Sequence, residues 1–192
     1  MTTTSSIPNT LTGTYTVDPA HSRIGFVARH AMVTKVRGSF NEFDGSGYFD
    51  AADPTKSHLQ LNIKAASIDT RNAARDAHLR SNDFFSMDEF PEITFASTSI
   101  EQVSPEKFRV TGDLTIKGVT KPVTLDVAYT GAAVDPYGNQ RIGLEASATV
   151  NRKDWGVNWN AALEAGGVLV SESVNLEIEI SAIRAADAGS PA

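Results

Sequence analysis

Hydrophobic and polar residues alternate with a period of two along most of the chain. In residues 107–117 the apolar side chains fall on one face of an extended strand, and this face carries Phe108, Val110, Leu114 and Ile116. The same alternation recurs in residues 24–28, 59–65, 123–129, 142–150 and 174–180. Strands with one dry and one wet face are typical of antiparallel sheets. The pattern therefore predicts an all-β protein.

Turn sequences separate these strands and indicate their connections. They are Ser104-Pro105-Glu106, Lys117-Gly118 and the run 135–139. Gly45 and Gly47 predict a bulged, strongly bent strand pair in residues 40–49. About eight to ten strands result, and their length and meander order favour a closed barrel over a sandwich. The interior of an eight-stranded barrel is either filled by side chains or wide enough for one small ligand.

Two segments depart from the alternation. Residues 70–79 favour a short helix, with Thr70 or Asn72 as the N-cap, and a second short turn is expected at residues 83–85. Residues 154–167 form an irregular stretch that is too long for a hairpin. This stretch is predicted to be a functional loop or a short helix over a barrel mouth.

The two ends of the chain differ in composition from the rest. Residues 1–12 are rich in Ser and Thr, and residues 185–192 are rich in Ala, Gly and Pro. Both are predicted to be disordered tails, because neither can bury enough surface to order itself. Residues 13–184 contain no repeat, linker or break in composition, so they are predicted to form one domain.

Composition narrows the classes of function. The chain has 192 residues and a formal charge of −6, so a basic face for nucleic acid is not expected. No stretch approaches the roughly 18 apolar residues of a membrane span. Residues 1–12 carry no Lys or Arg and no apolar run, so no secretory signal is expected, and a cytoplasmic location is predicted. With no cysteine, thiolate catalysis and Cys-based metal sites are excluded.

Candidate catalytic chemistry is weak. Asp18, His21 and Ser22 invite comparison with a catalytic triad, but His21 and Ser22 adjoin at a strand start and leave on opposite faces. Asp18 precedes a proline, which favours a turn in which its carboxylate caps backbone amides. The four histidines show no metal-ligand spacing. No catalytic residue, metal site or cofactor is therefore predicted.

The predicted helix offers a candidate binding cluster. Arg71, Arg75, His78 and Leu79 recur at helical spacing and would share one face. Arg75 and His78 could contact a phosphate or carboxylate head group. The alternative is that these charges decorate the surface or form ion pairs that tie the helix to strand ends.

Several sequence blocks, taken in order, closely resemble the YceI-like, polyisoprenoid-binding protein family. They cover most of residues 15–183 and comprise Tyr15–Ser22, Arg37–Phe40, Phe43–Gly45, Ser67–Thr70, Arg75–Phe85, Pro91–Phe95, Gly112–Val123 and Asn151–Gly156. The resemblance implies an extended, eight-stranded, lipocalin-like antiparallel barrel with a short helix. It also implies a pore that holds a polyisoprenoid or isoprenoid quinone-like lipid. Relatives are often dimeric, so a homodimer is possible, and many carry a secretion signal that is not evident here.

The leading hypothesis is therefore non-enzymatic binding, transport or storage of a long apolar amphiphile. The residues predicted to line the pore are Phe26, Phe40, Ile63, Phe84, Phe95, Leu114, Val127 and Trp155. Trp155 stands where the family commonly has Phe, which could shorten the pore or merely exchange one aromatic for another. Two alternatives remain, an enzyme acting on an apolar substrate inside the barrel and a filled structural or stress-response barrel without a ligand.

Overall fold

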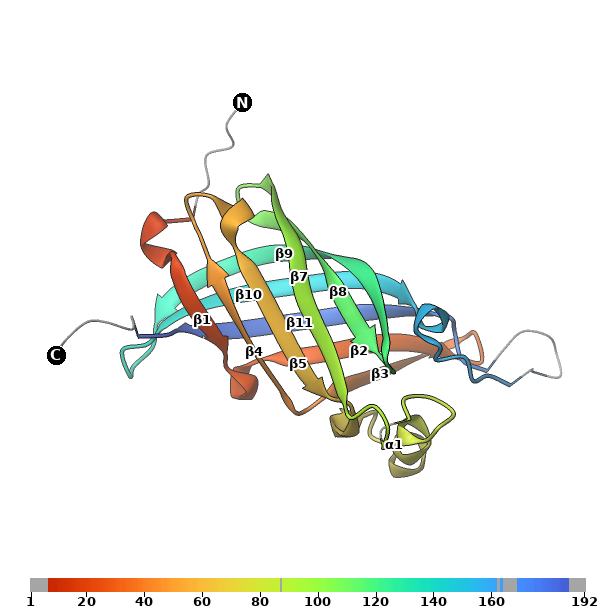
Figure 1. Ribbon diagram of the computed structural model, residues 1–192. Helices are drawn as coiled ribbons and strands as arrows, with labels where there is room; N and C mark the ends of the chain where they lie inside the picture. The colour runs from red at the N-terminus through yellow and green to blue at the C-terminus, as the bar shows by residue number, and fades with distance from the viewer. Residues whose placement is uncertain (1–6, 87, 162, 164–168, 187–192) are drawn as a thin grey trace.

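The chain folds into a closed antiparallel β-barrel with one short α-helix outside it (Figure 1). The computed structural model describes residues 7–86, 88–161, 163 and 169–186. The strands are β1 (Gly13–Val17), β2 (Arg23–His30), β3 (Thr34–Phe40), β4 (Phe43–Phe49), β5 (His58–Lys64), β6 (Ile68–Asp69), β7 (Glu92–Ser104), β8 (Lys107–Ile116), β9 (Val119–Val134), β10 (Gln140–Asn151) and β11 (Ser173–Arg184). The helix is α1 (Ala73–Arg80), and short 3-10 turns are η1 (Asn9–Leu11), η2 (Pro19–His21), η3 (Pro54–Lys56), η4 (Ala65–Ser67) and η5 (Arg152–Trp155).

Eight strands close the ring, as the sequence predicts. Their order is β1-β4-β5-β7-β8-β9-β10-β11, and β11 pairs back with β1. Every pairing is antiparallel. From β7 to β11 neighbours in sequence are neighbours in the sheet, which confirms the predicted meander.

The remaining strands, β2, β3 and β6, lengthen the barrel at one end. Residues 182–184 of β11 pair with β1, and residues 175–179 pair with β2, so β1 and β2 follow one another along the same edge. Pro19 interrupts this line because it has no N–H to donate to a ladder. The line of β3 and β4 breaks at residues 41–42, where the Asn41 amide donates to the Ser67 carbonyl, 3.1 Å away. The predicted bulge at Gly45 and Gly47 is wrong, because β4 pairs with β5 in one unshifted register through both glycines. The break between the two strands lies earlier, at residues 41–42.

The helix begins where one of the two predicted caps stands. The Asn72 side chain accepts a hydrogen bond from the Arg75 amide at 2.9 Å, so Asn72 and not Thr70 is the N-cap. Arg71 lies outside the helix in a left-handed conformation with φ 63°. The predicted face of Arg71, Arg75, His78 and Leu79 is therefore wrong in its first member, because the helical spacing begins only at Ala73. No helix in the described part of the chain is long and apolar enough to cross a membrane.

The N-terminal segment packs against the barrel from residue 7 onward, which differs from the expected tail. Ile7 and Leu11 are buried, and the Ala51 amide donates to the Thr12 hydroxyl at 2.9 Å. Burial of these two apolar side chains stabilises the segment against the barrel, which its Ser- and Thr-rich composition did not indicate. In the predicted C-terminal tail, the Ala185 amide donates to the Thr14 carbonyl at 2.7 Å. Residues 1–6 and 187–192 of the two predicted tails lie outside the described residues.

Candidate functional site

Two cavities with mostly apolar walls lie in the barrel interior formed by the described residues. The wider cavity has a volume of about 180 Å³ and lies toward α1, with Phe84, Phe85 and Leu79 among its lining residues. The narrower cavity has a volume of about 140 Å³ and lies toward the end of β11 that pairs with β1. Each wall is built from alternate residues of the strands, because a period of two sends every second side chain inward.

Three side chains line both cavities. Leu61 of β5, Leu125 of β9 and Ile178 of β11 line both of them, and we refer to these as the waist residues. They come from strands spread around the ring, and the two cavities meet at these residues. A chain-like ligand that occupied both cavities would pass these three side chains.

All eight residues predicted to line a pore face one of these cavities. Val127 lies on the narrower cavity. The wider cavity is lined by Phe26, Phe40, Ile63, Phe84, Phe95, Leu114 and Trp155. Whether a ligand contacts them stays a prediction. Sequence reasoning missed the waist, because alternation identifies inward residues but not their level along the barrel.

Aromatic rings gather at the end of the wider cavity beside α1. The Phe84 ring centroid lies 5.3 Å from that of Trp159, and Phe40 meets Phe85 edge-on at 6.2 Å. Trp155 is buried and donates its indole N–H to the Leu114 carbonyl at 2.8 Å. This hydrogen bond fixes the ring against β8, so Trp155 forms part of the cavity wall.

The two predicted head-group residues stand outside both cavities. Arg75 donates to the Thr70 hydroxyl and to the Thr70 carbonyl, both at 2.7 Å. His78 lies 2.7 Å from a carboxylate oxygen of Asp83, and its ring contacts Phe84 edge-on at 5.1 Å. His78 is thus one ring away from the wider cavity, whereas Arg75 is held by the backbone that precedes the helix.

Arg152 is the charged residue in the wall of the wider cavity, and sequence reasoning assigned it no role. Its side chain is 8% exposed, and burial lowers the pKa of the guanidinium. It donates to the carbonyls of Val157 (2.6 Å), Ser171 (2.8 Å), Trp159 (3.0 Å) and Val170 (3.3 Å). A planar group with five N–H donors suits several carbonyls at once. Arg152 therefore ties residues 157–159 to residues 170–171 at the α1 end of the barrel.

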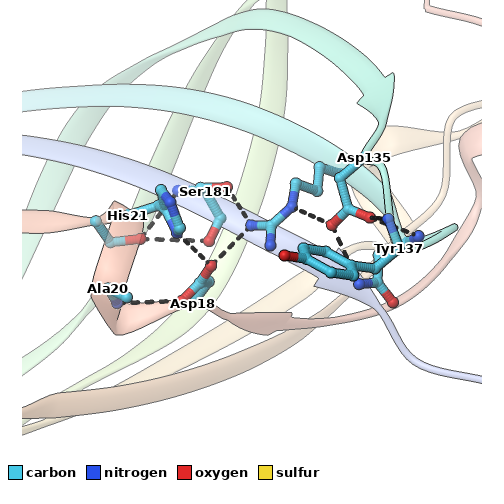
Figure 2. Close-up of polar contacts among 9 residues, drawn as sticks. Asp18, Ala20, His21, Asp135, Tyr137 and Ser181 are labelled. Carbon is cyan, nitrogen blue, oxygen red and sulfur yellow. Dashed lines mark hydrogen bonds and ion pairs between the residues drawn. The ribbon is translucent and has the colours of Figure 1, made fainter.

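A second polar cluster lies at the opposite end of the barrel. The guanidinium of Arg141 lies 2.7 Å from a carboxylate oxygen of Asp18 and 2.7 Å from one of Asp135. Figure 2 labels the two aspartates within this network of polar contacts. Asp18 also contacts the His21 ring at 2.8 Å and accepts from the Ala20 amide at 3.1 Å, which confirms its predicted capping role.

This cluster links strands and is not a triad. The Ser22 hydroxyl donates to the Ser181 carbonyl at 3.3 Å and accepts from the Ser181 amide at 3.0 Å, so its partner is β11. Arg141 joins the β1–η2 connection to the β9–β10 turn. The described residues contain no group of three or more His, Cys, Asp and Glu side chains that could hold a metal ion.

The Arg141 cluster predicts a loss of stability in acid. The hydrogen bond from Arg141 holds the pKa of Asp135 and that of Asp18 below the usual range. Carboxyls with a depressed pKa stabilise the folded state above their unfolded value of about 3.9, and this contribution is lost as pH falls through the folded pKa. The urea concentration at the unfolding midpoint should therefore decrease as the pH is lowered below about 4. The decrease should be less steep in Arg141→Met.

Arg109→Met serves as the control for this measurement, because the Arg109–Glu101 pair is exposed and its atoms are 3.6 Å apart. Its acid profile should follow that of the wild type. An Arg141→Met profile that also matches the wild type would show that the cluster does not set acid stability.

The fold and the two cavities define an antiparallel barrel with an apolar interior, and comparison with known proteins agrees. The chain matches the YceI-like domain over residues 15–182. UPF0312 proteins of Staphylococcus aureus strains MSSA476 and MW2 are each 43% identical over 164 residues, which is 85% of this chain and 93% of each relative. The chain belongs to the YceI-like family.

Solved structures share the fold. The Campylobacter jejuni YceI protein matches with a TM-score of 0.72 and 31% identity, covering 82% of this chain and 90% of that chain. Burkholderia cenocepacia BcnA matches with a TM-score of 0.76 and 24% identity, covering 86% and 98%. A polyisoprenoid binding domain from Saccharophagus degradans matches with a TM-score of 0.63 and 16% identity, covering 89% and 98%. The last two likenesses concern the fold alone.

Proposed function

We propose that this protein binds a long apolar amphiphile, of the polyisoprenoid or isoprenoid quinone class, inside the barrel and releases it again. The observation that carries the proposal is the pair of cavities aligned along one barrel, with mostly apolar walls. Membership of the YceI-like family and the fold shared with a polyisoprenoid binding domain support the choice of ligand class.

Two small cavities that follow one another along the barrel support a long, thin ligand. Sites for drug-sized ligands hold roughly 300–1,000 Å³, and neither cavity reaches that alone. A single prenyl chain that passes the waist residues would use both cavities. The walls offer such a chain contact along its length and almost no polar group.

Energetics favour a reversible carrier over a tight sink. Removing a methylene from water yields about 0.8 kcal/mol, but a lipid comes from a membrane or another protein and not from water. Bilayer and cavity are similarly apolar, so the transfer terms nearly cancel. Chain length, cavity shape and the polar head must then determine which lipid is held. We keep Arg75 and His78 as the proposed head-group contacts. His78 packs against a ring that lines the wider cavity, and Arg75 precedes it by one turn of the same helix.

The direct test is organic extraction of protein purified from cells without detergent, followed by mass spectrometry. A stoichiometric amphiphile is expected. An extract without lipid, together with no uptake of a fluorescent prenyl probe, would instead support the filled barrel. A cytoplasmic site of action, a homodimer and the absence of catalysis remain parts of the proposal, and product analysis of any extracted lipid tests the last of them.

Two cavity-filling variants test whether one ligand spans both cavities. Leu114→Trp fills the wider cavity and Val127→Trp fills the narrower one. If one chain runs through the waist, each variant should shorten the longest prenyl chain retained, with roughly a fourfold loss of affinity for each methylene excluded from the protein into water.

Overpacking can itself destabilise by roughly 1–3 kcal/mol, so circular dichroism must first show that each variant is folded. Probe affinity is then measured over a series of chain lengths. A folded Val127→Trp with the wild-type length preference would confine the ligand to the wider cavity.

A further inference from the structure

The hairpin between β2 and β3 exposes two apolar side chains at its tip. Met32 is 61% exposed and Val33 is 75% exposed. Ala31 and Met32 adopt left-handed conformations, with φ of 50° and 65°. Turns of this kind usually contain Gly or Asn, so an alanine and a methionine here carry a conformational strain that either of those residues would avoid. The apolar tip is thus not explained by the requirements of the turn.

Basic residues flank this tip, although the protein as a whole is acidic. Residues 23–40 contain four basic and no acidic residues, whereas the whole chain has a formal charge of −6. Arg37 is 3.2 Å from Glu177, but no ion pair among the described residues engages Arg29 or Lys35. At physiological salt, charges farther away than about 8 Å are largely screened. The basic residues beside the tip therefore determine its electrostatic attraction to a charged surface, and the net charge of the whole chain matters less.

The tip lies at the end of the barrel that holds the wider cavity. The Ala31 amide donates to the Leu169 carbonyl at 2.8 Å, and His30 forms an isolated β-bridge with Val170. Val170 lines the wider cavity, and its carbonyl accepts from Arg152. Figure 1 shows the β2–β3 tip and the β9–β10 turn at opposite ends of the barrel.

We propose that the β2–β3 tip docks the protein on an anionic membrane surface, with Met32 and Val33 entering the interfacial layer and Arg29 and Lys35 facing the lipid phosphates. Apolar side chains bordered by basic ones are suited to this boundary. The docked orientation sets the end with the wider cavity against the bilayer, where a lipid could enter or leave. The role in lipid exchange rests on the proposed function, whereas docking itself does not.

Vesicle flotation tests the docking step. The full chain is mixed with vesicles of phosphatidylcholine alone or of phosphatidylcholine with phosphatidylglycerol. Binding to the anionic vesicles is expected, and added salt should weaken it. Arg29→Gln with Lys35→Gln should reduce the partition coefficient roughly fivefold for each cation removed. Met32→Asn with Val33→Thr should reduce it at least about tenfold. Asn tolerates the left-handed conformation, so this second pair should remain folded.

The control is a matched pair at the opposite end of the barrel. Val134 is 65% exposed and Tyr137 is 89% exposed, beside the β9–β10 turn. Val134→Thr with Tyr137→Asn should bind anionic vesicles like the wild type. The proposal is overturned if this control loses as much binding as the tip variants, or if the wild type binds both kinds of vesicle equally. It is also overturned if sedimentation shows that the tip variants only dissociate a dimer.

Docking and lipid binding can fail separately. Uptake of a soluble prenyl probe in the absence of vesicles reports on the cavities alone, and the tip variants should keep it at the wild-type level. Transfer of the same probe from anionic vesicles should slow in step with the loss of flotation. Vesicle binding without any probe uptake would retain the docking surface and refute the proposed function.

Discussion

Leu125→Arg should be the most damaging single substitution in the barrel wall. Leu125 is buried and is one of the three waist residues, so the new guanidinium would stand between two apolar cavities. A buried charge without a partner destabilises by several kcal/mol, out of the roughly 5–15 kcal/mol that keeps a domain folded. Urea denaturation should show this loss, and the protein that remains folded should carry no prenyl probe.

The neighbouring residue provides the control for this substitution. Thr124 is exposed on the outer face of β9, where its hydroxyl lies 3.0 Å from that of Thr111. Thr124→Arg adds the same charge to the same strand and loses at most one exposed hydrogen bond. Its stability should stay within about 0.5 kcal/mol of the wild type. An equal loss of unfolding free energy in the two variants would mean that β9 tolerates arginine on neither face. The effect could then not be assigned to the waist residues.

The contrast between these neighbours explains why so much of the barrel is predictable from sequence. A strand in a one-layer wall must send alternate residues inward, and the apolar set then identifies the inner face. This reasoning placed Phe26, Ile63 and Leu114 on the inside, and all three line the wider cavity. The meander order follows from short turns such as Lys117-Gly118, because a short turn places the two strands that it joins side by side, where they pair.

What alternation could not predict is the position of residues along the barrel axis. That position depends on the register between strands, such as the pairing of Leu125 with Val110, and register involves residues far apart in sequence. The interruptions after Val17 and Phe40 shift the register again. The waist and the split of the interior into two cavities follow from these long-range alignments. A period of two contains no information about them.

The polar residues were harder to interpret because their roles depend on which backbone groups surround them. Arg75 has the spacing of a head-group ligand, yet its guanidinium bonds to Thr70 just before the helix. Arg152 follows directly after β10 in a segment that sequence analysis treated only as part of a family pattern. Its four carbonyl partners belong to two segments that sequence cannot bring together.

Arg152→Met should therefore loosen the α1 end of the barrel while the strands remain intact. Methionine fills much of the same volume but leaves the carbonyls of Val157, Ser171 and Trp159 without this donor. The Val170 carbonyl is affected less, since Asn160 also donates to it at 2.8 Å. Val157 is buried, so water does not readily replace its lost bond. A buried carbonyl without a partner costs about 1–3 kcal/mol, part of which is offset because the guanidinium no longer has to be desolvated.

Hydrogen exchange measured by NMR distinguishes local loosening from global instability. The Val157 amide donates to the Arg152 carbonyl, and the Val170 amide donates to the Asn160 side chain. Both amides should exchange on the order of tenfold faster or more in the variant. Amides in the middle of β8 and β9 should change little. Arg152→Lys keeps the positive charge but not the planar fork, so it should behave like Arg152→Met if the carbonyl contacts are what matters. A uniform increase across all strands would show global destabilisation and no local role for Arg152. Wild-type exchange in Arg152→Lys would instead assign Arg152 a role based on charge. If the loosened segment borders the route of the lipid, a prenyl probe should also leave the Arg152→Met barrel faster than it leaves the wild type.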